Sequence, residues 1–154
     1  MKIYQLNAKQ KLPISVDEAW NLLSSPKNLQ LITPPYMGFK ILSGADRPIF
    51  AGQIIQYSVT PLLNIPTKWV TEITNVVDKE YFVDEQRFGP YAMWHHAHFI
   101  KKIDGGVEME DVVNYKLPLG FLGQLVHPFL VQPKLDEIFE YRRKKLIELY
   151  GEFK

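Results

Sequence analysis

The fold is decided by residues 94–117, WHHAHFIKKIDGGVEMEDVVNYKL, in which two alternating segments flank the turn at 104–106. Glycine supplies the positive φ angles that a two-residue hairpin turn requires. Across such a turn, even-numbered residues of the first strand share a face with odd-numbered residues of the second. We expect the more apolar face to point toward the core, and it comprises Trp94, His96, His98, Ile100, Val107, Met109, Asp111, Val113, Tyr115 and Leu117.

Three polar side chains, those of His96, His98 and Asp111, fall on this apolar face. Burying such groups without partners costs roughly a few kcal/mol each. We therefore expect them to bond to one another, to water or to a ligand. The two preceding segments alternate in the same way and add to this face Phe82, Asp84 and Gln86 and, one strand further, Trp69, Thr71 and Ile73.

Turn residues divide much of the remaining chain into further strands. From residue 39 onward no helical pattern interrupts them, so they are expected to form an antiparallel meander. The predicted strands cover residues 3–13, 39–42, 53–61, 67–77, 81–88, 94–103 and 107–117.

Two short helices are predicted between the first two strands. Ser15 and Glu18 have the spacing of a capping box, which places a helix start directly after Ser15. Trp20 follows on its apolar face and is expected to dock this helix onto the core. Ser25-Pro26 predicts a second start, and the proline pair at 34–35 requires that helix to end before it.

A long helix is predicted over residues 134–150, where the apolar period changes to that of a helix. Gly151 is its expected stop. Pro128 and Pro133 are expected to break or kink any helix that begins before them. Arg142 lies within the apolar stripe, and we interpret it as structural, with a buried stem and a head group that reaches water.

Length and composition exclude several classes of function. The 154 residues predict one domain over 1–154, and the absence of cysteine excludes disulfides, thiolate metal sites and cysteine nucleophiles. A formal charge of +1 does not favour nucleic acid or an anionic membrane as partner. The sequence has neither a signal-peptide pattern nor the roughly 18 apolar residues of a membrane span. We expect a cytoplasmic protein that is a monomer or a homodimer.

The polar residues of the inner face allow three roles. His96, His98 and Asp111 could bind a metal ion, because two imidazoles and a carboxylate are a common donor set. An aspartate, Asp111 or Asp84, with a histidine could act as acid and base. The third role is a hydrogen-bonded patch in a pocket wall. We adopt the third, and expect no metal and no cofactor.

Three connections are unusually apolar, at residues 34–39, 62–66 and 119–123. Loops normally face water. Apolar loops are therefore expected either to pack over the mouth of a cavity or to meet a partner, which makes a protein-interaction module a further hypothesis.

A set of short motifs runs through nearly the whole chain: Trp69-x-x-Glu72-Ile73, Phe82-x-Asp84-x-Gln86-x-x-Gly89-Pro90, Trp94-x-His96-x-His98-Phe99, Asp111-x-Val113-x-Tyr115-x-Leu117-Pro118-x-Gly120 and Phe139-x-Tyr141-Arg142. With the order of elements, they resemble the helix-grip fold of the START and plant-allergen-like superfamily (SRPBCC), and within it a bacterial ligand-binding, polyketide cyclase/dehydrase-like group. The resemblance implies an α+β fold. In it a curved, antiparallel, seven-stranded sheet wraps around a long C-terminal helix, two short helices follow the first strand, and a deep cavity lies under the long helix.

The expected function is binding of a small hydrophobic or amphipathic molecule in that cavity, as a carrier, a sensor or a sequestering protein. The alternative is a cyclase-, dehydratase- or isomerase-type enzyme that uses an Asp/His acid–base pair in the same cavity; no catalytic residues are assigned. The residues expected to contact the ligand are Trp69, Phe82, Asp84, Gln86, Trp94, His96, His98, Asp111, Val113 and Tyr115.

Overall fold

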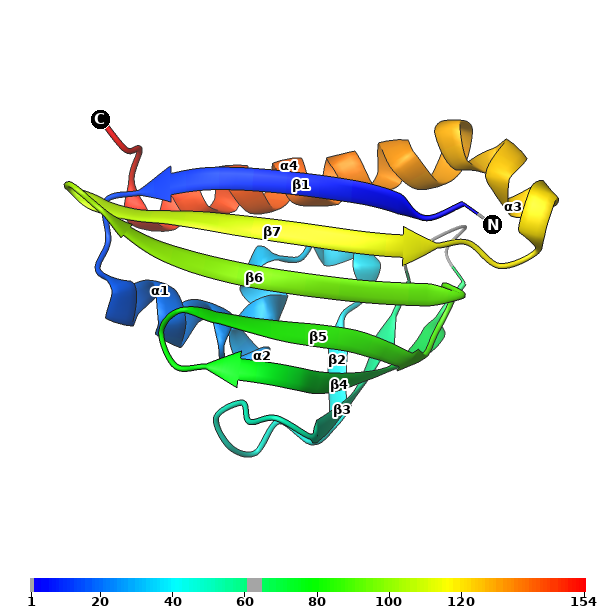
Figure 1. Ribbon diagram of the computed structural model, residues 1–154, viewed down its shortest axis with the longest axis horizontal. Helices are drawn as coiled ribbons and strands as arrows, with labels where there is room; N and C mark the ends of the chain where they lie inside the picture. The colour runs from blue at the N-terminus through cyan, green and yellow to red at the C-terminus, as the bar shows by residue number, and fades with distance from the viewer. Residues whose placement is uncertain (1, 61–64) are drawn as a thin grey trace.

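The computed structural model describes residues 2–60 and 65–154. One antiparallel sheet carries the short helices and the long C-terminal helix on the same side (Figure 1). The elements follow in the order β1 (Tyr4–Leu12), α1 (Val16–Leu23), α2 (Pro26–Leu29), η1 (Gln30–Ile32), η2 (Pro35–Met37), β2 (Lys40–Ser43), β3 (Gln53–Val59), β4 (Thr67–Val77), β5 (Tyr81–Phe88), β6 (Met93–Ile103), β7 (Gly106–Lys116), α3 (Gly120–Val126), η3 (His127–Val131) and α4 (Gln132–Tyr150).

The sheet has seven strands in the order β1-β7-β6-β5-β4-β3-β2. Strands β2 to β7 form the predicted meander, and β1 pairs with β7, so the first and last strands of the chain lie side by side. The α+β class, the seven antiparallel strands and the long C-terminal helix are confirmed.

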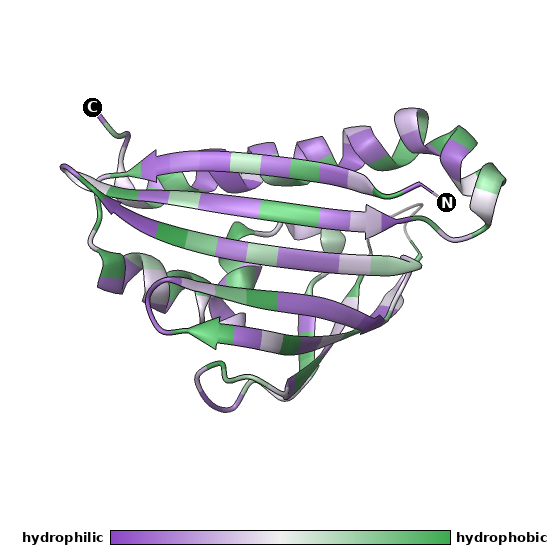
Figure 2. Cartoon of the chain, in the orientation of Figure 1, coloured by the Kyte–Doolittle hydropathy of each residue, from purple (hydrophilic) through white to green (hydrophobic). Residues whose placement is uncertain are grey.

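The register of the β6–β7 hairpin is also confirmed. Trp94 lies opposite Tyr115, and His98 lies opposite Asp111. Every odd-numbered residue of β7 from Val107 to Tyr115 is buried, while the even-numbered residues are half-buried. Figure 2 shows the corresponding change between hydrophobic and hydrophilic residues along both strands. The turn favours glycine at Gly105, which has a φ of 77°.

Strand β5 brings a carboxylate next to the histidines of β6. Asp84 lies opposite His96, and Phe82 lies opposite His98. On the other side of β5, Ile73 of β4 lies opposite Asp84, with a register shift on either side of the segment 71–73. Such bulges bend a strand. Between these two bulges the pairing is regular, so Asp84 keeps the predicted place beside His96 on the inner face.

The short helices between β1 and β2 begin where the sequence predicts. The Ser15 hydroxyl accepts a hydrogen bond from the Glu18 amide at 3.2 Å, and the Glu18 carboxylate accepts one from the Ser15 amide at 2.8 Å. Trp20 is buried, with its ring edge-on to that of Phe82 at 6.0 Å between centroids. Ser25 precedes α2 as its cap residue, but its side chain makes no capping hydrogen bond with the described residues.

The C-terminal helix is longer than predicted. It begins at Gly120, and α3, η3 and α4 follow one another without a break to Tyr150. Pro128 and Pro133 do not end it; each lies at the start of its segment, and the helix is kinked there (Figure 1), which is one of the two outcomes expected from the sequence. The five residues of η3 form a π-helical segment, and the axis changes direction there (Figure 1).

Candidate functional site

A cavity of about 210 Å³ lies between the sheet, the short helices and α4. Its walls are mostly aliphatic and aromatic, and they come from α1, α2, η1 and strands β3 to β6 as well as from α4. The cavity lies where the sheet and the long helix were expected to leave a hollow. Its volume is smaller than the roughly 300–1,000 Å³ usual for ligand pockets.

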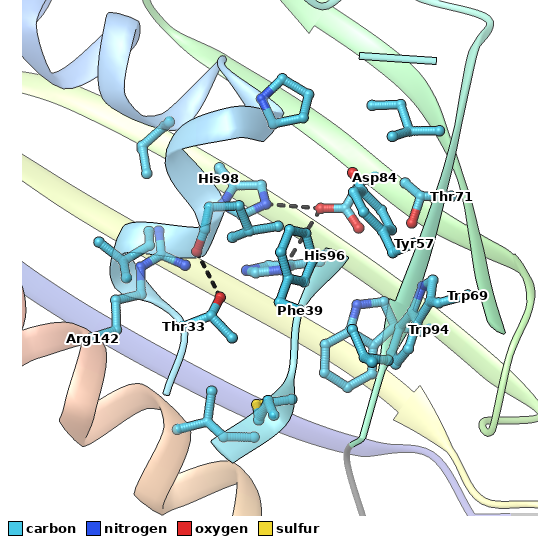
Figure 3. A pocket seen from close by; sticks show the side chains of 18 of the residues that line it. Thr33, Phe39, Tyr57, Trp69, Thr71, Asp84, Trp94, His96, His98 and Arg142 are labelled. Atoms are coloured by element: carbon cyan, nitrogen blue, oxygen red, sulfur yellow. Dashed lines mark hydrogen bonds and ion pairs between the residues drawn. The ribbon is translucent and has the colours of Figure 1, made fainter. Parts of the chain in front are cut away.

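Six of the ten residues predicted to contact a ligand line this cavity. They come from three neighbouring strands, β4, β5 and β6, and their side chains point into the same space (Figure 3). The six are Trp69, Phe82, Asp84, Trp94, His96 and His98.

The other four predicted residues lie outside the described cavity lining. Gln86 spans the β5–β6 connection, where its amide donates to the Tyr91 carbonyl at 2.7 Å. Asp111 is buried and bonds to His96. Val113 and Tyr115 pack into an apolar cluster with the start of α4. There the Tyr115 hydroxyl lies 2.7 Å from His127 Nε2, so this part of the inner face is filled by side chains.

Arg142 corrects our interpretation of the long helix. Its side chain is only 8% exposed, so its head group does not reach water; Nη2 lies 3.3 Å from Asp111 Oδ1. The guanidinium turns inward because Asp111 faces the helix from β7 and carries the opposite charge. The signal in the sequence was the position of Arg142 within the stripe of Leu135, Phe139 and Leu146.

The three apolar connections differ in whether they line the cavity. Met37 and Phe39 of the first line the cavity, as expected for a loop that covers it. Leu62, Leu63 and Asn64 of the second lie outside the described residues. Phe121 in the third is exposed and lies outside the described cavity lining.

Asp84, His96 and His98 form a polar cluster on the cavity wall. Asp84 Oδ2 lies 2.8 Å from His98 Nε2 and 3.7 Å from His96 Nδ1 (Figure 3). The two imidazole rings are 3.7 Å apart between centroids, and Phe82 stacks on the His98 ring at 4.2 Å. One carboxylate oxygen therefore faces both imidazoles from the neighbouring strand.

Asp111 faces the same two imidazoles on their other side. Its Oδ1 lies 3.0 Å from His96 Nε2 and 2.8 Å from His98 Nδ1. The first contact is a hydrogen bond, whereas the second is close but not well aligned. Arg142 completes the group, and its Nε has no hydrogen-bond partner among the described residues.

Burial and charge act against each other on these groups. Burial opposes ionisation of Asp111, but the Arg142 guanidinium and the two histidines hold its pKa well below the usual range. Burial also acts to raise the pKa of Asp84. The hydrogen bond from His98 and the charges of both imidazoles outweigh burial, so the pKa of Asp84 is lowered overall.

The two histidines shift in opposite directions. Burial and the neighbouring His98 lower the pKa of His96. Burial also acts to lower the pKa of His98, but its contacts with Asp111 and Asp84 outweigh this and raise it. His98 therefore keeps its proton to higher pH than His96 does.

Aromatic rings form the wall beside the polar cluster. Trp69 and Trp94 meet edge to face at 5.4 Å, and Tyr91, which lies outside the strands, packs against both. Tyr91 lies outside the sequence motifs, between Pro90 and Trp94. Its side chain reaches the cavity because the β5–β6 connection folds back over the sheet, held by Gln86.

A second hollow of about 300 Å³ lies between β1 and α4. Arg142 and Phe139 line both hollows, while Asp111 lines only the second. Arg142 and Asp111 thus separate an apolar cavity from a hollow with mixed walls that include several charged side chains.

No helix in the described part of the chain is both long and apolar enough to cross a membrane.

Several solved structures share this fold. Ginseng major latex-like protein 151 from Panax ginseng matches with a TM-score of 0.71 and 9% sequence identity over 96% of this chain and 97% of that one. Protein TTHA0849 from Thermus thermophilus matches with a TM-score of 0.69 and 17% identity over 94% and 95% of the two chains. Ara h 8.0201 matches with a TM-score of 0.63 and 11% identity over 96% and 99%.

These structural matches confirm the helix-grip fold that the sequence resembles, and at such low identity they establish the fold alone. No protein-family model matches the sequence. A search of curated proteins gave no match either.

Proposed function

We propose that the chain binds a small hydrophobic or amphipathic molecule in the cavity between the sheet and α4. The observation that carries this proposal is a hollow whose walls are predominantly apolar and on which the polar side chains of Asp84, His96 and His98 converge. Ligand pockets usually combine these two features, because apolar area supplies affinity and a few polar groups fix orientation.

The volume of the cavity favours a compact ligand. An engineered protein cavity of about 150 Å³ takes up benzene, so about 210 Å³ fits a molecule with one or two rings or a short chain. A ring would stack against the edge-to-face pair of Trp69 and Trp94. A polar group on it would meet Asp84 and His98 at the other end of the wall.

Native mass spectrometry of the protein as purified from its host tests the proposal. We expect a bound mass that is released on denaturation and that rebinds to the stripped protein. Thr71 is buried and lines the cavity, so Thr71→Phe should fill it and abolish rebinding. The neighbouring Val70 lies outside the described lining, and Val70→Phe is the matched control. An empty protein that binds nothing from a panel of apolar metabolites would contradict the proposal.

A second candidate function is acid–base catalysis in the same cavity. It is favoured by one observation, the 2.8 Å contact between His98 Nε2 and Asp84 Oδ2 on the cavity wall. Such a pair can move protons on a bound molecule. In this case His98→Gln should abolish conversion of the bound molecule while its Kd stays nearly unchanged. A variant that changes only the affinity would leave binding as the function.

A further inference from the structure

The three polar side chains on the cavity wall bring donor atoms unusually close together. Asp84, His96 and His98 each offer one nitrogen or oxygen, and these atoms all lie within 4.8 Å of one another. The local structure explains the convergence. Residues 96 and 98 share a face of β6 because side chains alternate along a strand, and Asp84 lies directly opposite His96 on β5.

The orientation of the imidazole rings is the second observation. Each ring turns one nitrogen toward Asp111 and the other toward Asp84. His96 Nε2 and His98 Nδ1 lie 3.0 and 2.8 Å from Asp111 Oδ1. His96 Nδ1 and His98 Nε2 lie 3.7 and 2.8 Å from Asp84 Oδ2. Two different nitrogens of two histidines thus face the same oxygen.

We propose that Asp84 Oδ2, His96 Nδ1 and His98 Nε2 bind one divalent transition-metal ion on the cavity wall, with Asp111 holding the imidazoles from behind. Histidines that bind a metal generally donate their other ring N–H to a carboxylate, which fixes the ring and its tautomer. Asp111 occupies that position for His96 through a hydrogen bond to Nε2, and it lies 2.8 Å from Nδ1 of His98 without a well-aligned hydrogen bond. Asp111 lies outside the described lining of the cavity, whereas the three ligands line it.

The two contacts of Asp84 lie close to the separations found around a bound ion. Ligand atoms bound at about 2.0–2.2 Å to one ion in tetrahedral geometry lie about 3.3–3.6 Å apart. The two contacts of Asp84 Oδ2, at 2.8 and 3.7 Å, fall on either side of that range. The sequence had offered Asp111 as third ligand; the structure favours Asp84 because Asp111 is already paired with Arg142.

The donor set indicates the class of metal ion and leaves coordination positions for water or a substrate. Two imidazoles and one carboxylate suit Zn²⁺ or Fe²⁺ better than Ca²⁺ or Mg²⁺, which prefer oxygen ligands. With three protein ligands, the remaining coordination positions of the ion face the cavity, as in sites where water or a substrate completes the shell. This inference goes beyond the proposed function, because it rests on the donor atoms and not on uptake of an apolar molecule.

Metal titration of the full-length protein, after removal of metal with a chelator, tests the site. With Co²⁺ as a spectroscopic probe we expect visible absorption bands that differ from those of the aqueous ion and saturate at one ion per chain. Zn²⁺ should displace Co²⁺ in competition. Asp84→Asn, His96→Ala and His98→Ala should abolish the bands. His95→Gln should keep them, since residue 95 points to the opposite face of β6.

Variants of Asp111 and Asp84 distinguish a residue that orients the imidazoles from one that binds the ion. Because it holds the rings and does not bind the ion, Asp111→Asn should weaken binding by about 10–100-fold and keep the stoichiometry at one. If Asp111→Asn abolished the bands while Asp84→Asn kept them, the proposed ligand set would be wrong. Circular dichroism of each variant separates loss of ligands from loss of fold, and Asp84→Asn conserves the volume of the side chain.

A measurement on the unmodified protein identifies the ligand nitrogens directly. With ¹⁵N-labelled histidine, binding of Zn²⁺ should shift Nδ1 of His96 and Nε2 of His98, two nitrogens that a nonspecific surface site would not select. Shifts confined to His95 or His127, or binding no tighter than that of the His96→Ala/His98→Ala protein, would overturn the proposal. An apolar ligand that binds to metal-free protein would leave the proposed function intact even in that event.

Discussion

Arg142 of α4 and Asp111 of β7 meet inside the protein, with Nη2 of one 3.3 Å from Oδ1 of the other. Both side chains are about nine-tenths buried. Removing one partner of a buried ion pair destabilises a protein by roughly 3–5 kcal/mol, because the remaining charge is left without either its partner or water. The pair thus couples the helix to the sheet at the point where the two hollows meet.

Replacing Arg142 with methionine is expected to lower the free energy of unfolding by about 3 kcal/mol. Methionine fills much of the same space, so the loss comes mainly from leaving the Asp111 carboxylate without its cation. The value lies at the lower end of the usual range because His96 and His98 remain beside Asp111. Urea unfolding at neutral pH measures the change.

Two further variants separate charge from packing. Arg142→Met combined with Asp111→Asn should recover part of the loss, because no uncompensated charge stays buried. Arg143 is the next residue, its pair with Glu140 is exposed, and Arg143→Met should leave stability nearly unchanged. Equal stability of Arg142→Met and Arg143→Met would show that the buried pair stabilises nothing.

The pH dependence of stability should include a decline above about pH 6.5 because of His98. Its contacts with Asp111 and Asp84 raise its pKa in the folded protein above the ordinary value of about 6.5. The folded state then holds this proton more tightly than the unfolded chain does. The stabilisation is complete below about pH 6.5 and is lost as the pH rises through the folded-state pKa.

The free energy of unfolding, measured in urea from pH 5 to pH 9, tests this expectation. The decline above about pH 6.5 should be smaller in His98→Gln than in the unmodified protein, while the control His95→Gln should keep it. The pKa of His96 is lowered, so this residue contributes the opposite slope, a loss of stability as the pH falls below about 6.5. An unchanged alkaline decline in His98→Gln would contradict the assignment.

Two of the three tryptophans should report on ligand binding. Trp69 and Trp94 line the cavity, whereas Trp20 packs against Phe82 outside the described lining. A ligand that enters the cavity should therefore change the tryptophan fluorescence in Trp20→Phe but not in the double variant Trp69→Phe/Trp94→Phe. A response that disappears only in Trp20→Phe would place the binding site elsewhere.

The strands could be predicted because local signals and burial agree in them. In β7 the alternation of apolar and polar residues runs without interruption from Val107 to Tyr115. A two-residue turn then fixes the partner of each residue, because one slip would turn the whole apolar set outward. The same argument places His96 and His98 on one face with Asp111, and the alternation of the preceding strand adds Asp84.

The site could be predicted only where residues share the sheet. Arg142 lies on another element, and a periodic stripe does not specify whether a long side chain turns inward or snorkels to water. Tyr115 lies outside the described lining of the cavity for a related reason. It does lie on the inner face, but η3 brings His127 to its hydroxyl, and the π-helical segment that does so leaves no periodic signal in the sequence.

The hairpin that decides the fold offers a last test. A Cβ atom at Gly106 would overlap the carbonyl oxygen of Leu12 in β1, so Gly106→Ala must push the first strand away from β7. We expect a loss of about 1–3 kcal/mol, as for other overpacked positions. Gly105 has a φ of 77°, which asparagine tolerates, and the nearest side-chain atoms to its added Cβ are 3.8 Å away, so Gly105→Asn is a milder control in the same turn. Thermal unfolding compares the two, with hydrogen exchange of the β1 amides as the local readout. If Gly106→Ala and Gly105→Asn gave the same thermal stability and the same hydrogen exchange of β1, the close contact with β1 would not be the reason for glycine at position 106.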